Sequence, residues 1–132
     1  MTARSTARTP QSYARGELVI VLDAADLERA ADFWSQVLGY RRTGSSGKYL
    51  SLIPADGVGC ELLLQRVDDV KREKNRLHLD LRTADLEAEV ARVVALGATV
   101  LTGEPIVEDG WRWHVLGDLD GNEFCVLQVP TS

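Results

Sequence analysis

Apolar and polar positions alternate along two stretches of the chain that repeat one another. VIVLDAADLER at 19–29 and HLDLRTADLEA at 78–88 share this pattern, and both contain the tetrapeptide ADLE, at 25–28 and 84–87. Alternation with a period of two predicts a strand, and the helical spacing that follows it predicts an amphipathic helix. Because the same unit recurs within a short chain, we predict one domain that arose by internal duplication from two like halves.

The first repeat predicts a helix over 27–38. Asp26 is suited to cap its N-terminus, and Glu28 lies in the first turn, where the helix dipole favours an acid. Gly39 is expected to end this helix. Its apolar stripe consists of Leu27, Ala30, Ala31, Trp34 and Leu38. The second repeat predicts a similar helix that is capped by Asp85 and has an apolar stripe at Leu86, Val90, Val93 and Gly97.

Apolar runs bounded by turn residues predict the strands of each half. In the first half they lie at 18–23, 40–43, 48–53 and 60–67. In the second half they lie at 76–82, 99–101, 111–116 and 123–129. The resulting order is β-α-β-β-β, twice, which defines an α+β fold class. A ferredoxin-like β-α-β-β-α-β sandwich is the main rival, but it has too few strands for this many turns.

The domain boundaries follow from the same pattern. We predict a single domain over 17–129, with module one at 17–67, a charge-dense linker at 68–75 and module two at 76–129. The segment 1–16 contains no acid and few apolar residues. Its composition weakly resembles that of an organellar transit peptide, but a disordered N-terminal tail is the preferred interpretation, since such a segment buries too little apolar surface to order itself.

Composition narrows the range of partners. The 132 residues carry a net charge of −5, which argues against nonspecific nucleic-acid binding. No apolar run reaches the roughly 18 residues of a membrane span, so no membrane partner is expected. The two cysteines, Cys60 and Cys125, are too few for a disulfide framework and indicate a cytoplasmic location.

Three motifs in this order resemble the vicinal oxygen chelate superfamily, which includes glyoxalases, bleomycin resistance proteins and extradiol dioxygenases. They are DLERAADFWSQVLG at 26–39, NRLHLDL at 75–81 and DLDGNEFC at 118–125. The similarity is greatest to the glyoxalase-like subgroup, whose members mostly lack an assigned reaction. It implies two tandem modules that form an open, concave mixed β-sheet barrel with helices outside. It further implies a small-molecule ligand in the concave cleft, in many members one divalent metal, and a homodimer.

Strand alternation predicts which side chains face such a cleft. If the apolar alternate positions pack under the helices, the opposite face carries a polar set: Glu61, Gln65, His78, Asp80, Glu123 and Cys125. Three aromatic residues are further candidates for ligand binding: Tyr49, Trp111 and Trp113. A solvated sheet face is the alternative for the polar set, and helix packing or a dimer contact is the alternative for the tryptophans. If Trp111 and Trp113 line the cleft, Arg112 and His114 point the other way.

The resemblance also implies where metal ligands would lie, one from the first and one from the last strand of each half. The first strands offer Val19, which cannot ligate, and His78. The last strand of half one offers Glu61, whereas the family's position four residues after Gly121 holds Cys125. Zn²⁺ would accept Glu61, His78 and Cys125, but the set is incomplete, so we predict no cofactor, with zinc as the possible exception.

The alignment of Glu61 itself stays open. Matching Gly59-x-Glu61 with Gly121-x-Glu123 would make Leu63, rather than Glu61, the counterpart of Cys125. A hydrogen-bonded core or cleft histidine is the alternative role for His78, and a small apolar filler is the alternative role for Cys125.

These observations favour a protein that binds a small planar or aromatic molecule without the standard complete metal site. Two enzymatic alternatives remain. One is a metal-dependent lyase, isomerase or dioxygenase that acts on a substrate with vicinal oxygens. The other is a metal-free enzyme in which His78 and Glu61 are the catalytic acid and base.

Overall fold

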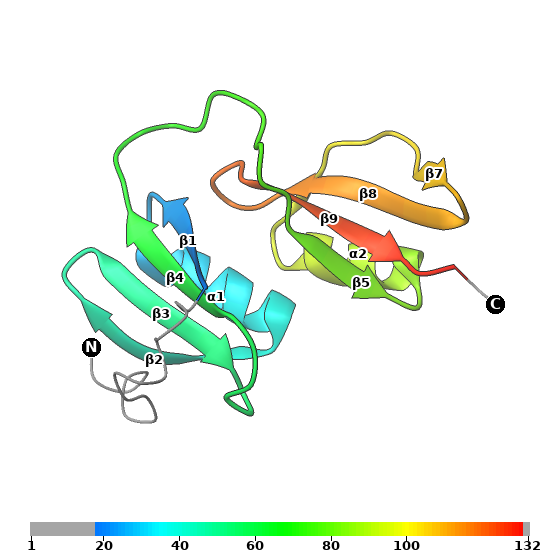
Figure 1. Ribbon diagram of the computed structural model, residues 1–132. Coiled ribbons are helices and arrows are strands. Elements are labelled where there is room, and N and C mark those ends of the chain that lie inside the picture. Colours follow the sequence, from blue (N-terminus) through cyan, green and yellow to red (C-terminus); the bar gives the residue numbers. More distant parts are fainter. Residues whose placement is uncertain (1–17, 131–132) are drawn as a thin grey trace. The chain divides into compact units, whose positions relative to one another are not determined.

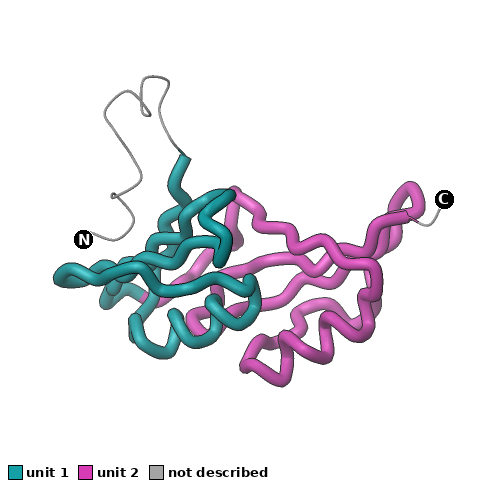
Figure 2. The backbone as a smooth tube through the Cα atoms, turned by 90° about the horizontal axis from the view of Figure 1, so that it is seen from below, with its two compact units in different colours: residues 1–69 teal, residues 70–132 magenta. Residues whose placement is uncertain are grey.

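The computed structural model describes residues 18–130, so the predicted tail at 1–16 lies outside the described residues. The chain divides into two compact units, residues 1–69 and 70–132, each of which we describe by itself (Figure 2). In the described part of the chain, no helix has the length and apolar character needed to cross a membrane.

Unit one is a four-stranded sheet with one helix (Figure 1). Its elements are β1 (Val19–Ala24), α1 (Leu27–Leu38), β2 (Tyr40–Ser46), β3 (Tyr49–Pro54) and β4 (Glu61–Arg66). The strand order is β1-β4-β3-β2, with β1 parallel to β4 and the other pairs antiparallel. The helix α1 packs against β2, β3 and β4, and it buries Trp34 together with Phe33 in an edge-to-face pair.

The ends of α1 form as the sequence predicts. The Asp26 side chain accepts a hydrogen bond from the Arg29 backbone N–H at 3.2 Å, which caps the first turn. Gly39 ends the helix in the left-handed conformation, at φ 68°, which costs glycine nothing because it lacks a Cβ. Asp85 caps the second helix in the same way, through the Ala88 backbone N–H at 3.1 Å.

Unit two repeats this plan with one additional strand. Its elements are β5 (Asp80–Thr83), α2 (Leu86–Ala95), β6 (Thr99–Val100), β7 (Ile106–Glu108), β8 (Trp111–Gly117) and β9 (Glu123–Gln128). The strand order is β5-β9-β8-β6, and β7 pairs with β8 as a hairpin. The helix α2 packs against β8 and β9, over a core that contains Leu86, Val93, Leu116, Phe124 and Val126.

The structure confirms the α+β class; unit one has the β-α-β-β-β order, and unit two has the same order with β7 inserted. Besides shifts of strand ends, such as that of β2, which runs to Ser46 rather than to 43, two details differ from the sequence prediction. The strand predicted at 76–82 begins only at Asp80, although the Cys125 N–H still bonds the Leu79 carbonyl at 2.8 Å. Strand β7 was not predicted, because its three residues are too few to show an alternating pattern.

Candidate functional site

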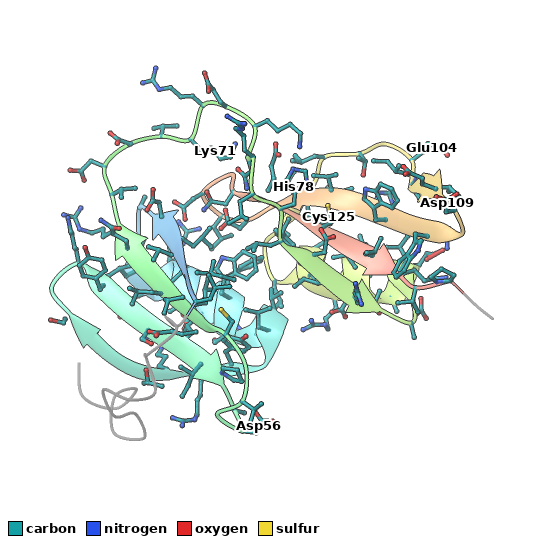
Figure 3. The ribbon with its side chains drawn as sticks, viewed as in Figure 1. Asp56, Lys71, His78, Glu104, Asp109 and Cys125 are labelled. Carbon is teal, nitrogen blue, oxygen red and sulfur yellow. The ribbon has the colours of Figure 1, made fainter. Side chains whose placement is uncertain are left out.

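A pocket of about 390 Å³ lies on one face of the unit-two sheet. Its lining comes from β5, β7, β8, β9 and the residues beside them: His78, Asp80, Arg82, Glu108, Asp109, Trp111, Trp113, Cys125 and Leu127. Figure 3 labels His78 and Cys125 where β5 and β9 begin, and Asp109 at the hairpin between β7 and β8. We call this space the aromatic pocket.

Strand alternation and register explain why these side chains meet. On β8, Trp111 and Trp113 line the aromatic pocket, whereas Arg112 between them bonds Glu87 of α2 at 3.1 Å. The tryptophans therefore lie on the sheet face opposite the helix. In the ladder, Leu127 of β9 pairs with Arg82 on one side and with Trp113 on the other.

The aromatic pocket contains more acidic than basic side chains. Its three carboxylates belong to Asp80, Glu108 and Asp109, and its one permanent cation is Arg82. The Arg82 guanidinium lies over the Trp111 ring, 5.5 Å from its centroid, which is a cation–π contact. Excess carboxylate makes the local potential favourable for cations.

The Cys125 thiol is held in its neutral form. Burial, followed by the negative charge of Asp80 and a hydrogen bond to it, raises the pKa of Cys125 to about 11. At neutral pH the sulfur is thus a thiol, and the thiol is neither a good nucleophile nor a good metal ligand.

A second pocket, of about 230 Å³, adjoins the first in unit two. It shares His78, Trp113 and Cys125 with the aromatic pocket, and the rest of its lining is Lys74, Asn75, Leu77, Ile106, Val115, Glu123 and Phe124. Lys74 approaches Glu123 at 3.5 Å, and the Asn75 amide donates to the Glu123 carbonyl at 3.1 Å. We call this space the apolar pocket.

The remaining candidates from the sequence, Tyr49, Glu61 and Gln65, belong to unit one. Ser51 is fully buried, and its hydroxyl donates to the Glu61 carboxylate at 2.5 Å. Tyr49 on β3 pairs with Gln65 on β4. The structure therefore gathers His78, Asp80, Trp111, Trp113 and Cys125 along one pocket, has Glu123 in the adjoining one, and holds the other three candidates in unit one.

The ladder registers settle the alignment that the sequence left open. Val21 on β1 pairs with Leu63, and the residue 59 positions later, Asp80 on β5, pairs with Cys125. Cys125 is therefore the counterpart of Leu63, and Glu123 is the counterpart of Glu61.

The divalent metal that the resemblance implies has no evident site among the described residues. Among residues 18–130, no three His, Cys, Asp or Glu side chains gather into a group that could hold a metal ion. The donors agree with this, because Val19 has no ligand atom. Of the predicted zinc set, Glu61 belongs to unit one, whereas His78 and Cys125 belong to unit two.

Three charged residues that line the aromatic pocket are absent from the candidates that the sequence predicts: Arg82, Glu108 and Asp109. Arg82 has the same strand parity as His78 and Asp80, so extending the alternation by two residues would have found it. Glu108 and Asp109 belong to the hairpin, for which the Asp109-Gly110 pair is a turn signal.

The chain matches the family model described as "Glyoxalase-like domain" over residues 19–127, and it belongs to that family. Its fold is shared by solved structures of proteins in the glyoxalase/bleomycin resistance/dioxygenase superfamily. No similar sequence was found among curated proteins.

Solved structures share the fold at low sequence identity. The fosfomycin resistance protein FosX from Listeria monocytogenes, complexed with Mn(II) and sulfate, is 21% identical, with a TM-score of 0.71 over 88% of this chain and 90% of that chain. TioX from Micromonospora sp. ML1 is 20% identical, with a TM-score of 0.60 over 86% of this chain and 98% of that one. A glyoxalase/bleomycin resistance protein/dioxygenase family enzyme from Burkholderia phytofirmans PsJN is 17% identical. Its TM-score is 0.66 over 84% of this chain and 96% of that chain.

Proposed function

We propose that this protein binds a small planar aromatic cation in the aromatic pocket of unit two. The observation that carries the proposal is the pairing of two tryptophans with three carboxylates around one pocket of about 390 Å³. That volume lies within the roughly 300–1,000 Å³ of small-molecule sites. Indole faces attract flat rings and cations, and the carboxylates add an electrostatic preference for positive charge.

The contact between Arg82 and Trp111 supports the same ligand class. A guanidinium is itself planar and cationic, and here it lies over the indole at 5.5 Å. The Trp111 ring is therefore suited to a flat cation. A bound ligand would either displace the Arg82 side chain, which is largely exposed, or stack beside it.

Calorimetry with two matched ligands tests the proposal. N-methylquinolinium is a planar aromatic cation, and quinoline-2-carboxylate carries the same ring with a negative charge. We expect saturable binding of the cation and at least tenfold weaker binding of the anion. Trp111→Ala should weaken cation binding by about tenfold, since stacking on one aromatic side chain is worth about 1–3 kcal/mol.

Arg112→Ala is the matched control, because Arg112 lies between the two tryptophans but bonds Glu87 of α2. It should bind N-methylquinolinium like the wild type. Equal affinity for the two ligands, or equal losses in the Trp111 and Arg112 variants, would refute the proposed function.

A metal-dependent enzyme is the second candidate, because the structure of the similar FosX protein contains Mn(II). Elemental analysis after purification without chelator or metal affinity distinguishes the two. For a metal-free binder we expect far less than one metal ion per chain, and quinolinium binding that EDTA does not change. Near-stoichiometric metal that His78→Ala removes would favour the enzyme. A metal-free enzyme in which His78 and Glu61 are the catalytic acid and base stays a prediction. It can be tested by measuring turnover once a ligand is known.

A further inference from the structure

The apolar pocket differs in chemistry from the aromatic pocket that it adjoins. Five of its lining residues are aliphatic or aromatic: Leu77, Ile106, Trp113, Val115 and Phe124. The Phe124 side chain is buried in the core, so the apolar side chains open to a ligand are those of the other four. Its polar groups are largely engaged with one another, through the ion pair of Lys74 with Glu123 and the bond from the Asn75 amide to the Glu123 carbonyl. What this space offers to a ligand is therefore mainly apolar surface.

Size and continuity make this pocket an extension of its neighbour. About 230 Å³ is below the usual range for an independent small-molecule site. The two pockets have His78, Trp113 and Cys125 in common, so the same Trp113 side chain borders both. A molecule that stacks on the tryptophans can thus extend a substituent past Trp113 without leaving unit two.

We infer that the apolar pocket is a subsite for an alkyl or other apolar substituent on the ligand that occupies the aromatic pocket. This inference rests on the proposed function. The ligand class is then an amphiphilic aromatic cation, with a flat charged ring at Trp111 and Trp113 and an apolar arm against Leu77, Ile106 and Val115. Burial of the arm adds affinity with each methylene, since removing apolar surface from water is favourable.

A homologous ligand series tests the subsite. N-methyl-, N-butyl- and N-hexylquinolinium share one ring and one charge, and differ only in the length of the arm. Full burial of the arm should raise the affinity roughly fourfold for each methylene, and half burial should raise it about twofold for each methylene. We therefore expect N-hexylquinolinium to bind the wild type about thirtyfold more tightly than N-methylquinolinium in calorimetry.

Strand β7 supplies a matched pair of variants. Ile106 pairs with Trp113 and lines the apolar pocket, whereas the next residue, Val107, pairs with Arg112 and lines neither pocket. Both side chains are exposed, at 38% and 65%, so glutamine at either position should be tolerated. Ile106→Gln should reduce the ratio of the affinities for the hexyl and methyl compounds to about fivefold, without changing the affinity for N-methylquinolinium. Val107→Gln should change neither the ratio nor that affinity.

The binding of the methyl and hexyl compounds together distinguishes a failure of the subsite from a failure of the proposed function. If N-methylquinolinium binds but the hexyl compound binds no more tightly, the subsite is refuted and the proposed function stands. A ratio that is the same in both glutamine variants as in the wild type also refutes the subsite. If only the hexyl compound binds, and Ile106→Gln weakens it, the apolar subsite stands while the proposed recognition of the ring fails. If no compound binds, both proposals fail.

Discussion

The two units have the same strand plan but opposite character on the sheet face away from the helix. Under the helices both stay apolar, since Leu62 and Leu64 of β4 are buried like Phe124 and Val126 of β9. On the other face, the first strand of unit one carries Val19, Val21 and Asp23. At the corresponding positions, 59 residues later, unit two carries His78, Asp80 and Arg82. The two units therefore share an apolar face under the helix and differ on the opposite face.

The glutamates at equivalent places show the same divergence. Glu61 accepts a hydrogen bond from Ser51, which is fully buried. In unit two the register places Val115 at the position of Ser51, and Glu123 approaches Lys74 instead. An engaged polar pair in one unit thus corresponds to an apolar pocket wall in the other. A candidate ligand site in unit two is consistent with this asymmetry, and the following experiments test it.

The largest effect should appear at Cys125, whose counterpart in unit one is Leu63. Because the pKa of Cys125 is raised to about 11, its thiolate is scarce at pH 8 and grows about tenfold with each pH unit. Alkylation by iodoacetamide, followed at the Cys125 peptide by mass spectrometry, should accelerate about a hundredfold from pH 8 to pH 10. Asp80→Asn removes a charge that raises the pKa, so this variant should react faster at pH 8. A plateau near pH 9 in the wild type would contradict the assignment.

Alternation and capping made much of this architecture predictable. The β-α-β-β-β order follows from local patterns such as the alternation at 19–23 and the caps at Asp26 and Asp85. Strand parity also predicted that His78, Asp80 and Cys125 share a face, and these side chains line one pocket. Parity needs only the strand itself, which is why a single sequence carries it.

Other features depend on pairing between distant strands, which no local pattern encodes. Whether Cys125 corresponds to Glu61 or to Leu63 depended on the register of β5 against β9. The position of Arg82 over Trp111 depends on β5, β8 and β9 together. The short strand Ile106–Glu108 exists because β8 pairs with it, and its own three residues show no period.

A second, smaller effect concerns the aromatic residues at equivalent positions, Trp113 and Tyr49. Trp113 borders both pockets of unit two, so Trp113→Ala should weaken N-hexylquinolinium binding by about thirtyfold in calorimetry. Tyr49→Ala, in unit one, should change the affinity by less than twofold. Circular dichroism melts control for loss of fold in both variants. Equal losses would extend the ligand site to unit one and remove the asymmetry.

A third experiment concerns stability and makes unit one resemble unit two. Ser51→Ala removes the hydroxyl that bonds Glu61 and adds no bulk at this fully buried position. Because the carboxylate is only partly buried, we expect a loss of about 1–2 kcal/mol in the free energy of unfolding, measured by urea denaturation. Ser35→Ala, whose hydroxyl bonds the exposed Asp32 carbonyl, is the control and should cost less than about 0.5 kcal/mol. A loss no larger than that of the control would show that the Ser51–Glu61 bond is energetically unimportant.

The smallest expected effect comes from Arg82, whose counterpart in unit one is Asp23. Its guanidinium lies over Trp111 and is the permanent cation of the aromatic pocket, so it competes with a cationic ligand and repels it. Arg82→Ala should therefore tighten N-methylquinolinium binding about threefold, and Arg82→Asp about fivefold, because charge effects at an exposed site are modest and screened by salt. Raising the ionic strength should reduce this gain in affinity.

Arg66→Ala, which removes an exposed arginine paired with Asp68 in unit one, is the matched control and should leave the affinity unchanged. If Arg82→Ala instead weakens binding of the cation and Arg66→Ala does not, Arg82 assists binding. The ligand would then carry an acceptor for the guanidinium, as a zwitterion or an aromatic acid does, and the acidic excess of unit two would not set the charge of its ligand.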